Sequence, residues 1–130
     1  MATFTPLPSG FPIRQSACEL VDSAWSGDHL EAIFKSDGDE PCYICVTFDS
    51  IVTARMSEAL IFEAEAEAKN GISPEGFAYL VADGAMLAGV PAAGKAAYRN
   101  LRQYAFVSAS FCLEVLSTEP PSFELLEPQG

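Results

Sequence analysis

Short stretches in which apolar and polar residues alternate, separated by turn signals, constrain the fold of this chain more than any other feature. In residues 29–35 (HLEAIFK), leucine, alanine and phenylalanine fall on one side of an extended strand and the intervening residues fall on the other. The tripeptide Ser26–Gly27–Asp28 is a turn signal before this stretch, and Asp37–Gly38 is a hairpin signal after it. We therefore predict a first β-hairpin that joins residues 18–26 to residues 29–35.

Further stretches are predicted to be extended because they are short and contain many β-branched and aromatic residues. They are residues 43–48, 51–56 and 77–82, and the pair 103–108 and 111–117 that flanks a two-residue turn. The connections between neighbouring strands are short, which favours an antiparallel sheet.

One segment, residues 57–70 (SEALIFEAEAEAKN), has the composition of an α-helix, because alanine, leucine and glutamate are strong helix formers. Ser57 is the predicted N-cap, with Glu58 in the first turn, and Asn70–Gly71 is the predicted end. A second, short helix is expected from a cap at Asp83 to Ala88, whereas Gly94 weakens the helical spacing farther along. The predicted apolar stripe of the long helix consists of Leu60, Ile61, Ala64 and Ala68.

Together these elements predict the fold class α+β. We expect a single domain over residues 1–130, with a mainly antiparallel sheet of about five to seven strands and one principal helix packed on a face. Prolines in residues 1–13 favour an irregular lead-in. Pro120–Pro121 favours the end of the sheet and a C-terminal tail over residues 118–130.

A cytoplasmic location is expected. The sequence has no apolar run near the roughly 20 residues of a membrane helix, and no basic and apolar leader at its start. Its four cysteines, which include Cys18 and Cys112, are expected to be reduced there. Cys42 and Cys45 have the C-x-x-C spacing of zinc and redox sites, but in a strand they would point to opposite faces. We therefore predict no metal at this pair and interpret both as small hydrophobic residues.

A formal net charge of −11, from seven basic and 18 acidic residues, limits the partners. Affinity for nucleic acid and for anionic lipid comes mostly from Lys and Arg, so we expect neither ligand and favour a basic protein partner. A solvated helix face and an ordinary turn are the alternative interpretations of the acidic clusters, and the turn departs from the calcium-binding EF-hand pattern. The candidate partner-binding residues are Glu58, Glu63, Glu65 and Glu67 on the helix, and then Asp37, Asp39 and Glu40 in the turn.

One basic cluster interrupts this acidic chain. Lys95, Arg99 and Arg102 lie in residues 95–102, which contain no acid. Two interpretations stay open: the cluster neutralises nearby carboxylates, or it contacts an anion or a partner. It does not complete a phosphate loop, because Ala96 stands where that motif needs Ser or Thr after the lysine.

Catalytic motifs are missing from the sequence. No nucleophile motif occurs, and His29, the only histidine, has no assignable partner and fits an ordinary surface residue beside a turn. We therefore expect neither an enzyme nor a cofactor. Catalysis by carboxylates alone stays open, because spatial neighbours cannot be read from the sequence.

Residues 43–55 (YICVTFDSIVTAR) and 104–117 (YAFVSASFCLEVLS), the latter followed by Glu119–Pro120, resemble small acidic bacterial proteins of the polymorphic-toxin immunity type. The matching stretches cover roughly a fifth of the chain and contain no catalytic residue to transfer. The resemblance implies a non-enzymatic protein that binds and neutralises a cognate, basic toxin domain. The alternative is a small-ligand-binding or homo-oligomeric scaffold domain, such as a homodimer, in which Phe77, Tyr79, Tyr104 and Phe106 form a pocket or an interface instead of core.

Overall fold

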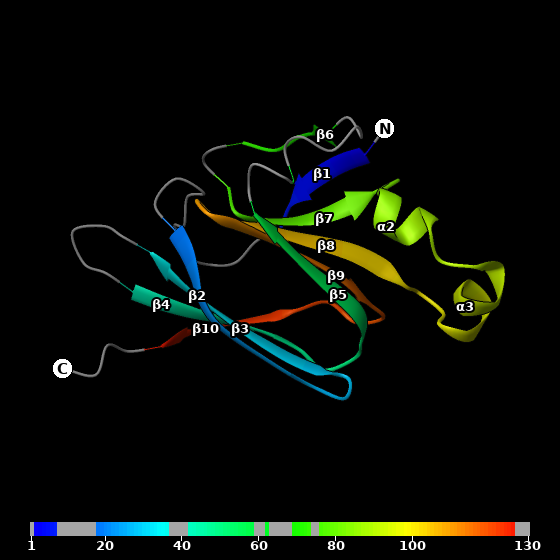
Figure 1. Cartoon of the computed structure of the whole chain (residues 1–130), viewed down its shortest axis with the longest axis horizontal. Coiled ribbons are helices and arrows are strands. Elements are labelled where there is room, and N and C mark those ends of the chain that lie inside the picture. Colours follow the sequence, from blue (N-terminus) through cyan, green and yellow to red (C-terminus); the bar gives the residue numbers. More distant parts are fainter. Residues whose placement is uncertain are drawn as a thin grey trace.

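The computed structural model describes residues 2–7, 18–36, 42–58, 62, 69–73 and 76–126. In these residues the chain forms two sheets, shown in Figure 1. All neighbouring strands among them are antiparallel except β1 and β6, which run parallel. The six-stranded sheet has the spatial order β5 (Ile51–Glu58), β9 (Phe111–Ser117), β8 (Arg102–Val107), β7 (Ala78–Ala82), β1 (Ala2–Pro6) and β6 (Lys69–Asn70). The four-stranded sheet has the order β10 (Ser122–Leu126), β4 (Cys42–Phe48), β3 (His29–Ser36) and β2 (Cys18–Ser26).

Two short connections carry the chain between the sheets. Asp49–Ser50 joins β4 to β5, and residues 118–121 join β9 to β10. The two connections contact each other, because the amide of Thr118 donates to the carbonyl oxygen of Ser50 at 3.2 Å. The hydroxyl of Ser117 donates to the same oxygen, also at 3.2 Å. These bonds tie the sheets together at the end where both crossings occur.

Most of the buried apolar residues lie between the two sheets and form one aromatic-rich core. Ring centroids lie 5.4 Å apart for Phe34 and Phe77, and 5.4 Å apart for Phe48 and Tyr104. Such tilted and edge-on pairs are favourable arrangements for aromatic rings. Because these rings come from β3, β4, β8 and the residue before β7, the core joins strands that are distant in the sequence.

A second core lies on the opposite face of the six-stranded sheet. There Phe4 of β1 contacts Tyr79 of β7 and Phe62, with ring centroids 5.8 Å and 6.2 Å apart. Phe62 is helical and 1% exposed. The six-stranded sheet is therefore buried on both faces, whereas the four-stranded sheet is buried by this packing on one.

The predicted hairpins are confirmed. β2 and β3 pair from Cys18 with Ser36 to Ser26 with His29, so only Gly27–Asp28 forms the loop. Gly27 has φ +62°, as the first position of a type II′ hairpin turn requires. β8 and β9 form the second predicted hairpin. The mostly antiparallel sheet and the single small domain also agree with the prediction.

The strands are more numerous than predicted, and they form two sheets instead of one. The lead-in expected over residues 1–13 contains β1, which pairs with β7 and ends at Pro6, where a missing amide does not interrupt the pairing. The tail expected over residues 118–130 contains β10, which pairs with β4. β10 is retained because Phe123 packs its ring against Phe77 and Phe106 in the main core.

The predicted helix over residues 57–70 is wrong at both ends. Ser57 and Glu58 continue β5, paired with Cys112 and Phe111, and Lys69–Asn70 forms β6. Tertiary pairing thus overrides the local capping signal. Phe62 is the buried helical residue that the structure describes, and the predicted apolar stripe omitted it. The stripe residues Leu60, Ile61, Ala64 and Ala68 lie outside the described residues.

The connection from β7 to β8 contains two short helices, α2 (Ala85–Ala88) and α3 (Ala92–Ala97). Gly84, not Asp83, precedes α2, because Asp83 adopts φ +57° in the turn that leaves β7. Neither helix buries a residue. Figure 1 shows α3 projecting from the end of the molecule opposite β10.

Candidate functional site

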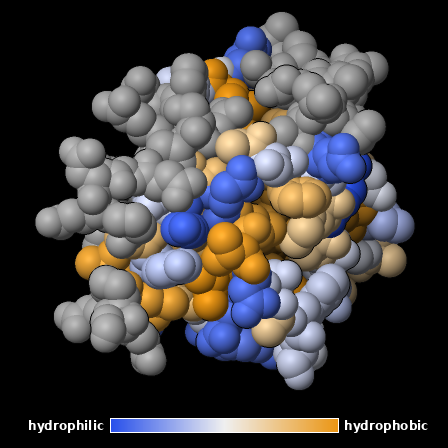
Figure 2. Space-filling view, turned by 60° about the vertical axis from the view of Figure 1, so that its left-hand side comes forward, coloured by the Kyte–Doolittle hydropathy of each residue, from blue (hydrophilic) through white to orange (hydrophobic). Residues whose placement is uncertain are grey.

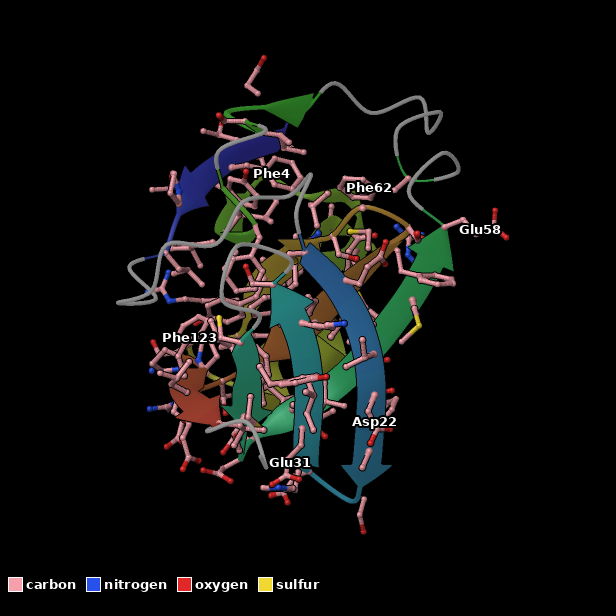
Figure 3. The ribbon with its side chains drawn as sticks, turned by 90° about the vertical axis from the view of Figure 1, so that its left-hand side faces the viewer. Phe4, Asp22, Glu31, Glu58, Phe62 and Phe123 are labelled. Carbon is pink, nitrogen blue, oxygen red and sulfur yellow. The ribbon has the colours of Figure 1, made fainter. Side chains whose placement is uncertain are left out.

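Of the acidic residues predicted to bind a partner, one is described by the structure and six are not. Glu58 is exposed at the end of β5. Figure 3 shows it well away from Asp22 and Glu31. The other six candidates, Glu63, Glu65, Glu67, Asp37, Asp39 and Glu40, lie outside the described residues. Of the predicted set, the structure therefore places Glu58 alone.

The outer face of the four-stranded sheet carries the acidic side chains that sequence reasoning missed. Strand alternation puts Leu30, Ala32 and Phe34 of β3 into the main core, so that the residues between them face outward. The strand register then places the outward residues of the four strands side by side. We call this surface the acidic sheet face and define it by Glu19, Asp22, Glu31 and Glu124.

The acidic sheet face also contains less polar residues at its centre. Ile33 and Cys45 lie between Asp22 and Glu124 in the register and are largely shielded by their neighbours. In the adjacent row Lys35 and Tyr43 lie between Glu19 and Leu126, so one lysine also belongs to this face. Figure 3 shows β2, β3 and β4 in front of the six-stranded sheet, and Figure 2 shows polar and apolar surface intermixed on this side of the molecule. A surface of this composition can contact another protein, because a less polar centre with a charged rim is the usual arrangement of an interface.

His29 lies at the end of the acidic sheet face, between two carboxylates. Its Nδ1 is 2.9 Å from Oδ1 of Asp49, and its Nε2 is 3.3 Å from Oε1 of Glu31. The hydrogen bond with Asp49, and then that with Glu31, raises the pKa of His29 above its usual value of 6.5. The prediction of an exposed residue beside a turn is confirmed, since 43% of the side chain is exposed. Protonation of His29 offsets part of the negative charge at this end of the face.

The basic cluster is exposed and lies elsewhere. Lys95 is in α3, and Arg99 and Arg102 follow it on the way into β8. All three are exposed, and within the described parts of the chain no carboxylate forms an ion pair with them. The interpretation as internal neutralisation therefore finds no support in these residues.

A buried charge network, which the sequence did not reveal, lies on the helix-bearing face of the six-stranded sheet. The carboxylate of Glu114 in β9 is 5% exposed and accepts hydrogen bonds from Nε of Arg55 at 3.1 Å and from its Nη2. Nε2 of Gln103 donates to the other Glu114 oxygen at 3.1 Å. Oε1 of Gln103 in turn accepts from the amide of Leu87 in α2 at 3.0 Å. Every polar atom of Glu114 is thus satisfied, which identifies the network as a structural support for α2 and the β5 edge.

The cysteine pair agrees with the strand prediction. Cys42 and Cys45 both lie in β4, and Cys45 shares the outer face with Thr47, whose Oγ1 is 3.7 Å from its Sγ. Cys42 belongs to the other face by strand alternation. All four cysteines are free thiols. In the described residues no three His, Cys, Asp or Glu side chains are grouped so as to hold a metal ion.

The aromatic residues considered for a ligand pocket are core residues. Phe77, Tyr104 and Phe106 are at most 3% exposed in the core between the sheets, and Tyr79 is fully buried on the other face of the six-stranded sheet. The hydroxyl of Tyr79 donates to the carbonyl oxygen of Ser73 at 3.0 Å. These four residues therefore pack the two cores and do not line a common pocket or interface.

Among the described helices, none is both long enough and apolar enough to span a membrane. Comparisons of the chain with protein-family models, with curated proteins and with solved structures found no match.

Proposed function

We propose that this protein is a non-enzymatic acidic binding protein whose partner is a basic protein domain. The acidic sheet face is the observation that carries the proposal. It combines outward Asp22, Glu31 and Glu124 with a less polar centre, on a sheet face that no described element covers. With a net charge of −11, the protein attracts a basic partner over several ångströms before contact, which raises the rate of association.

An immunity protein is the most concrete form of this proposal. A toxin domain that acts on nucleic acid presents a basic surface, and an acidic inhibitor that covers this surface blocks access to the substrate. The resemblance of residues 43–55 and 104–117 to immunity proteins supports this form. Both stretches contain inward residues of the main core, so they support the fold of such a protein, while the acidic sheet face supplies the contact.

Co-expression tests the proposal directly. The candidate partner is the protein encoded by the gene immediately upstream of the gene for this chain. Its C-terminal domain is expressed in bacteria with and without the chain. Growth arrest by that domain alone, relief by the chain and a stable 1:1 complex are expected. An upstream domain that does not affect growth, or a chain that does not bind it, would contradict the immunity function.

Two pairs of charge-neutralising variants then locate the contact. Asp22→Asn with Glu31→Gln removes two charges from the acidic sheet face, and Glu63→Gln with Glu67→Gln removes two from the predicted helix. Because both pairs change the net charge equally, the general attraction falls equally in each. We expect the first pair to slow association several-fold more than the second and to weaken its salt dependence further. Slower association with the second pair alone would move the contact to Glu63 and Glu67.

A further inference from the structure

β2 is an edge strand, and along most of its length no described residue pairs with its outer side. It lies at the end of the four-stranded sheet, and within the described residues no strand pairs with its outer side. The described contacts of this side are at its beginning, where the carbonyl oxygen of Cys18 accepts from the amide of Ala109 at 2.9 Å and Glu19 accepts from Ser110. We call the remaining segment, Leu20–Ser26, the β2 edge. The other edge strand, β10, is shorter and follows two prolines.

The backbone of the β2 edge offers hydrogen-bonding groups to a further strand. In a two-residue hairpin the residues that flank the loop are hydrogen bonded to each other, and the next pair is not. Ser26 and His29 flank the loop here, so Trp25 and Ser23 direct their amide and carbonyl groups away from β3. The bond from Ala109 to the Cys18 carbonyl confirms this outward direction at the other end of β2.

The side chains of the β2 edge show which chemistry would occupy it. Val21 is 49% exposed and Trp25 is 51% exposed, so apolar area remains uncovered. On the outer face Asp22 is exposed, and the small Ala24 lies directly opposite Glu31, which a long side chain can therefore reach. Natural proteins protect edge strands with lysine, proline or a β-bulge. Leu20–Ser26 contains neither lysine nor proline, and its register shift between Leu20 and Asp22 leaves Asp22–Ser26 as the regular part of the edge.

These charges discriminate between possible occupants. A second copy that paired through its own β2 edge would bring the Asp22 carboxylates of both copies onto one face, and like charges on neighbouring strands repel. A strand with Lys or Arg at every second position would instead place its cations beside Asp22 and Glu31. The remaining positions of such a strand would then lie on the face of Trp25, which pairs with inward-facing Leu30.

We infer that the β2 edge binds an extended, basic segment of the partner, which adds to the four-stranded sheet as a fifth strand next to β2. This inference rests on the proposed function and specifies how the basic partner is held. Main-chain hydrogen bonds supply affinity in this mode of recognition, and alternate side chains supply specificity.

Trp25 makes the inference testable, because it is the only tryptophan in the chain and lies on the β2 edge. The probe is a capped eight-residue peptide of alternating lysine and valine, added to the full chain. Its control is a lysine–proline peptide of equal length and charge, which cannot form a ladder because proline lacks the amide hydrogen. We expect the lysine–valine peptide alone to shift Trp25 emission to shorter wavelength and to reduce acrylamide quenching about twofold, since one side of the ring becomes covered.

Two variants test the charge contact. Asp22→Asn should weaken binding of the lysine–valine peptide about threefold, because one cross-strand charge pair is lost. Asp83→Asn is the matched control: it removes the same charge from an exposed residue after β7, and asparagine tolerates the positive φ found there. Binding to the Asp83→Asn variant should remain unchanged.

Four results would overturn the inference. Equal binding of the lysine–proline peptide, or equal weakening by Asp83→Asn, would show attraction by net charge without strand addition. A shift of Trp25 emission with protein concentration alone would assign the β2 edge to a second copy. Tight binding of the upstream-encoded domain with unchanged Trp25 emission would refute the edge contact while the proposed function stands. Failure of that domain to bind at all would contradict the proposed function itself.

Discussion

Replacement of Arg55 by methionine should be among the most destabilising single changes on the surface of this protein. The Glu114 carboxylate that Arg55 neutralises is 5% exposed, and the Arg55 side chain is 45% exposed. Removal of one partner of a buried ion pair costs about 3–5 kcal/mol, because the other charge is left without compensation. Gln103 still donates to Glu114 in the variant, so we expect a loss of about 2–3 kcal/mol in the free energy of unfolding.

The opposite change should cost much less. Glu114→Gln removes the buried charge, and the half-exposed Arg55 guanidinium can then be solvated by water. We expect a loss of about 1 kcal/mol, the usual contribution of a hydrogen bond. The double variant should lose only about 1–2 kcal/mol, less than the sum of the single losses, because no unpaired charge remains buried.

Thermal and urea unfolding of the four proteins would measure these differences. For 130 residues, an unfolding entropy of about 0.27 kcal/mol/K converts the expected loss for Arg55→Met into a Tm decrease of about 7–11 °C. Arg99→Met is the matched control, since it removes the same group from an exposed position with no ion-pair partner in the described residues, and should change Tm little. Additive losses in the double variant, or equal effects of the two single changes, would refute the reasoning.

Three further predictions concern a glycine, the histidine and a pair of cysteines. Gly84→Ala should lower the free energy of unfolding, measured in urea, by about 1–3 kcal/mol, because the added Cβ would lie 2.3 Å from Oε1 of Gln103, which holds α2. The control Gly89→Ala should be tolerated, because its Cβ would meet no atom closer than 3.4 Å. The pKa of His29, measured by NMR titration, should lie above 6.5. The protonated His29 therefore stabilises the fold fully below pH 6.5, and this stabilisation is lost as the pH rises through the folded-state pKa. The Tm difference between the wild type and His29→Asn should accordingly shrink from pH 6 to pH 8.5. Purified protein should contain no stoichiometric zinc, and Cys42→Ala with Cys45→Ala should leave this unchanged, because the two thiols lie on opposite faces of β4; one equivalent of zinc would contradict the strand geometry.

Strands with clear alternation and local turn signals could be predicted from the sequence. The β2–β3 hairpin was predicted because Gly27–Asp28 and the alternation in residues 29–35 are both local signals. β1 and β10 were missed because nearby prolines were interpreted as ends of the sheet. Pro6 instead closes β1, and Pro120–Pro121 precedes β10 within a connection, so in both places proline marks a strand boundary.

Features that depend on distant residues could not be predicted. Asp49–Ser50 has the length of a hairpin loop, but β5 pairs with β9 instead of β4, and that choice is made by residues some 60 positions away. Arg55 and Glu114 are 59 positions apart, so neither residue signals a buried pair on its own. Glu58 is the one residue of the predicted partner site that the structure describes. The acidic sheet face was missed because its residues become neighbours only through the order of the strands in the sheet, which depends on pairing between distant parts of the chain.

Charge alone would give this protein a fast but weak complex. Exposed ion pairs contribute at most about 1 kcal/mol each, because water and salt screen them, so Asp22, Glu31 and Glu124 mainly guide the encounter. A complex that persists needs interactions that exclude water, and the uncovered ring of Trp25 and the outward backbone of the β2 edge can supply them. The exposed basic residues of the α3 region lie at the opposite end of the molecule from β10, so on the proposed function they disfavour contact of a basic partner at that end. On the proposed function, the acidic sheet face attracts the basic partner to the four-stranded sheet, and β2 is an edge strand among the described strands to which a further strand can be added.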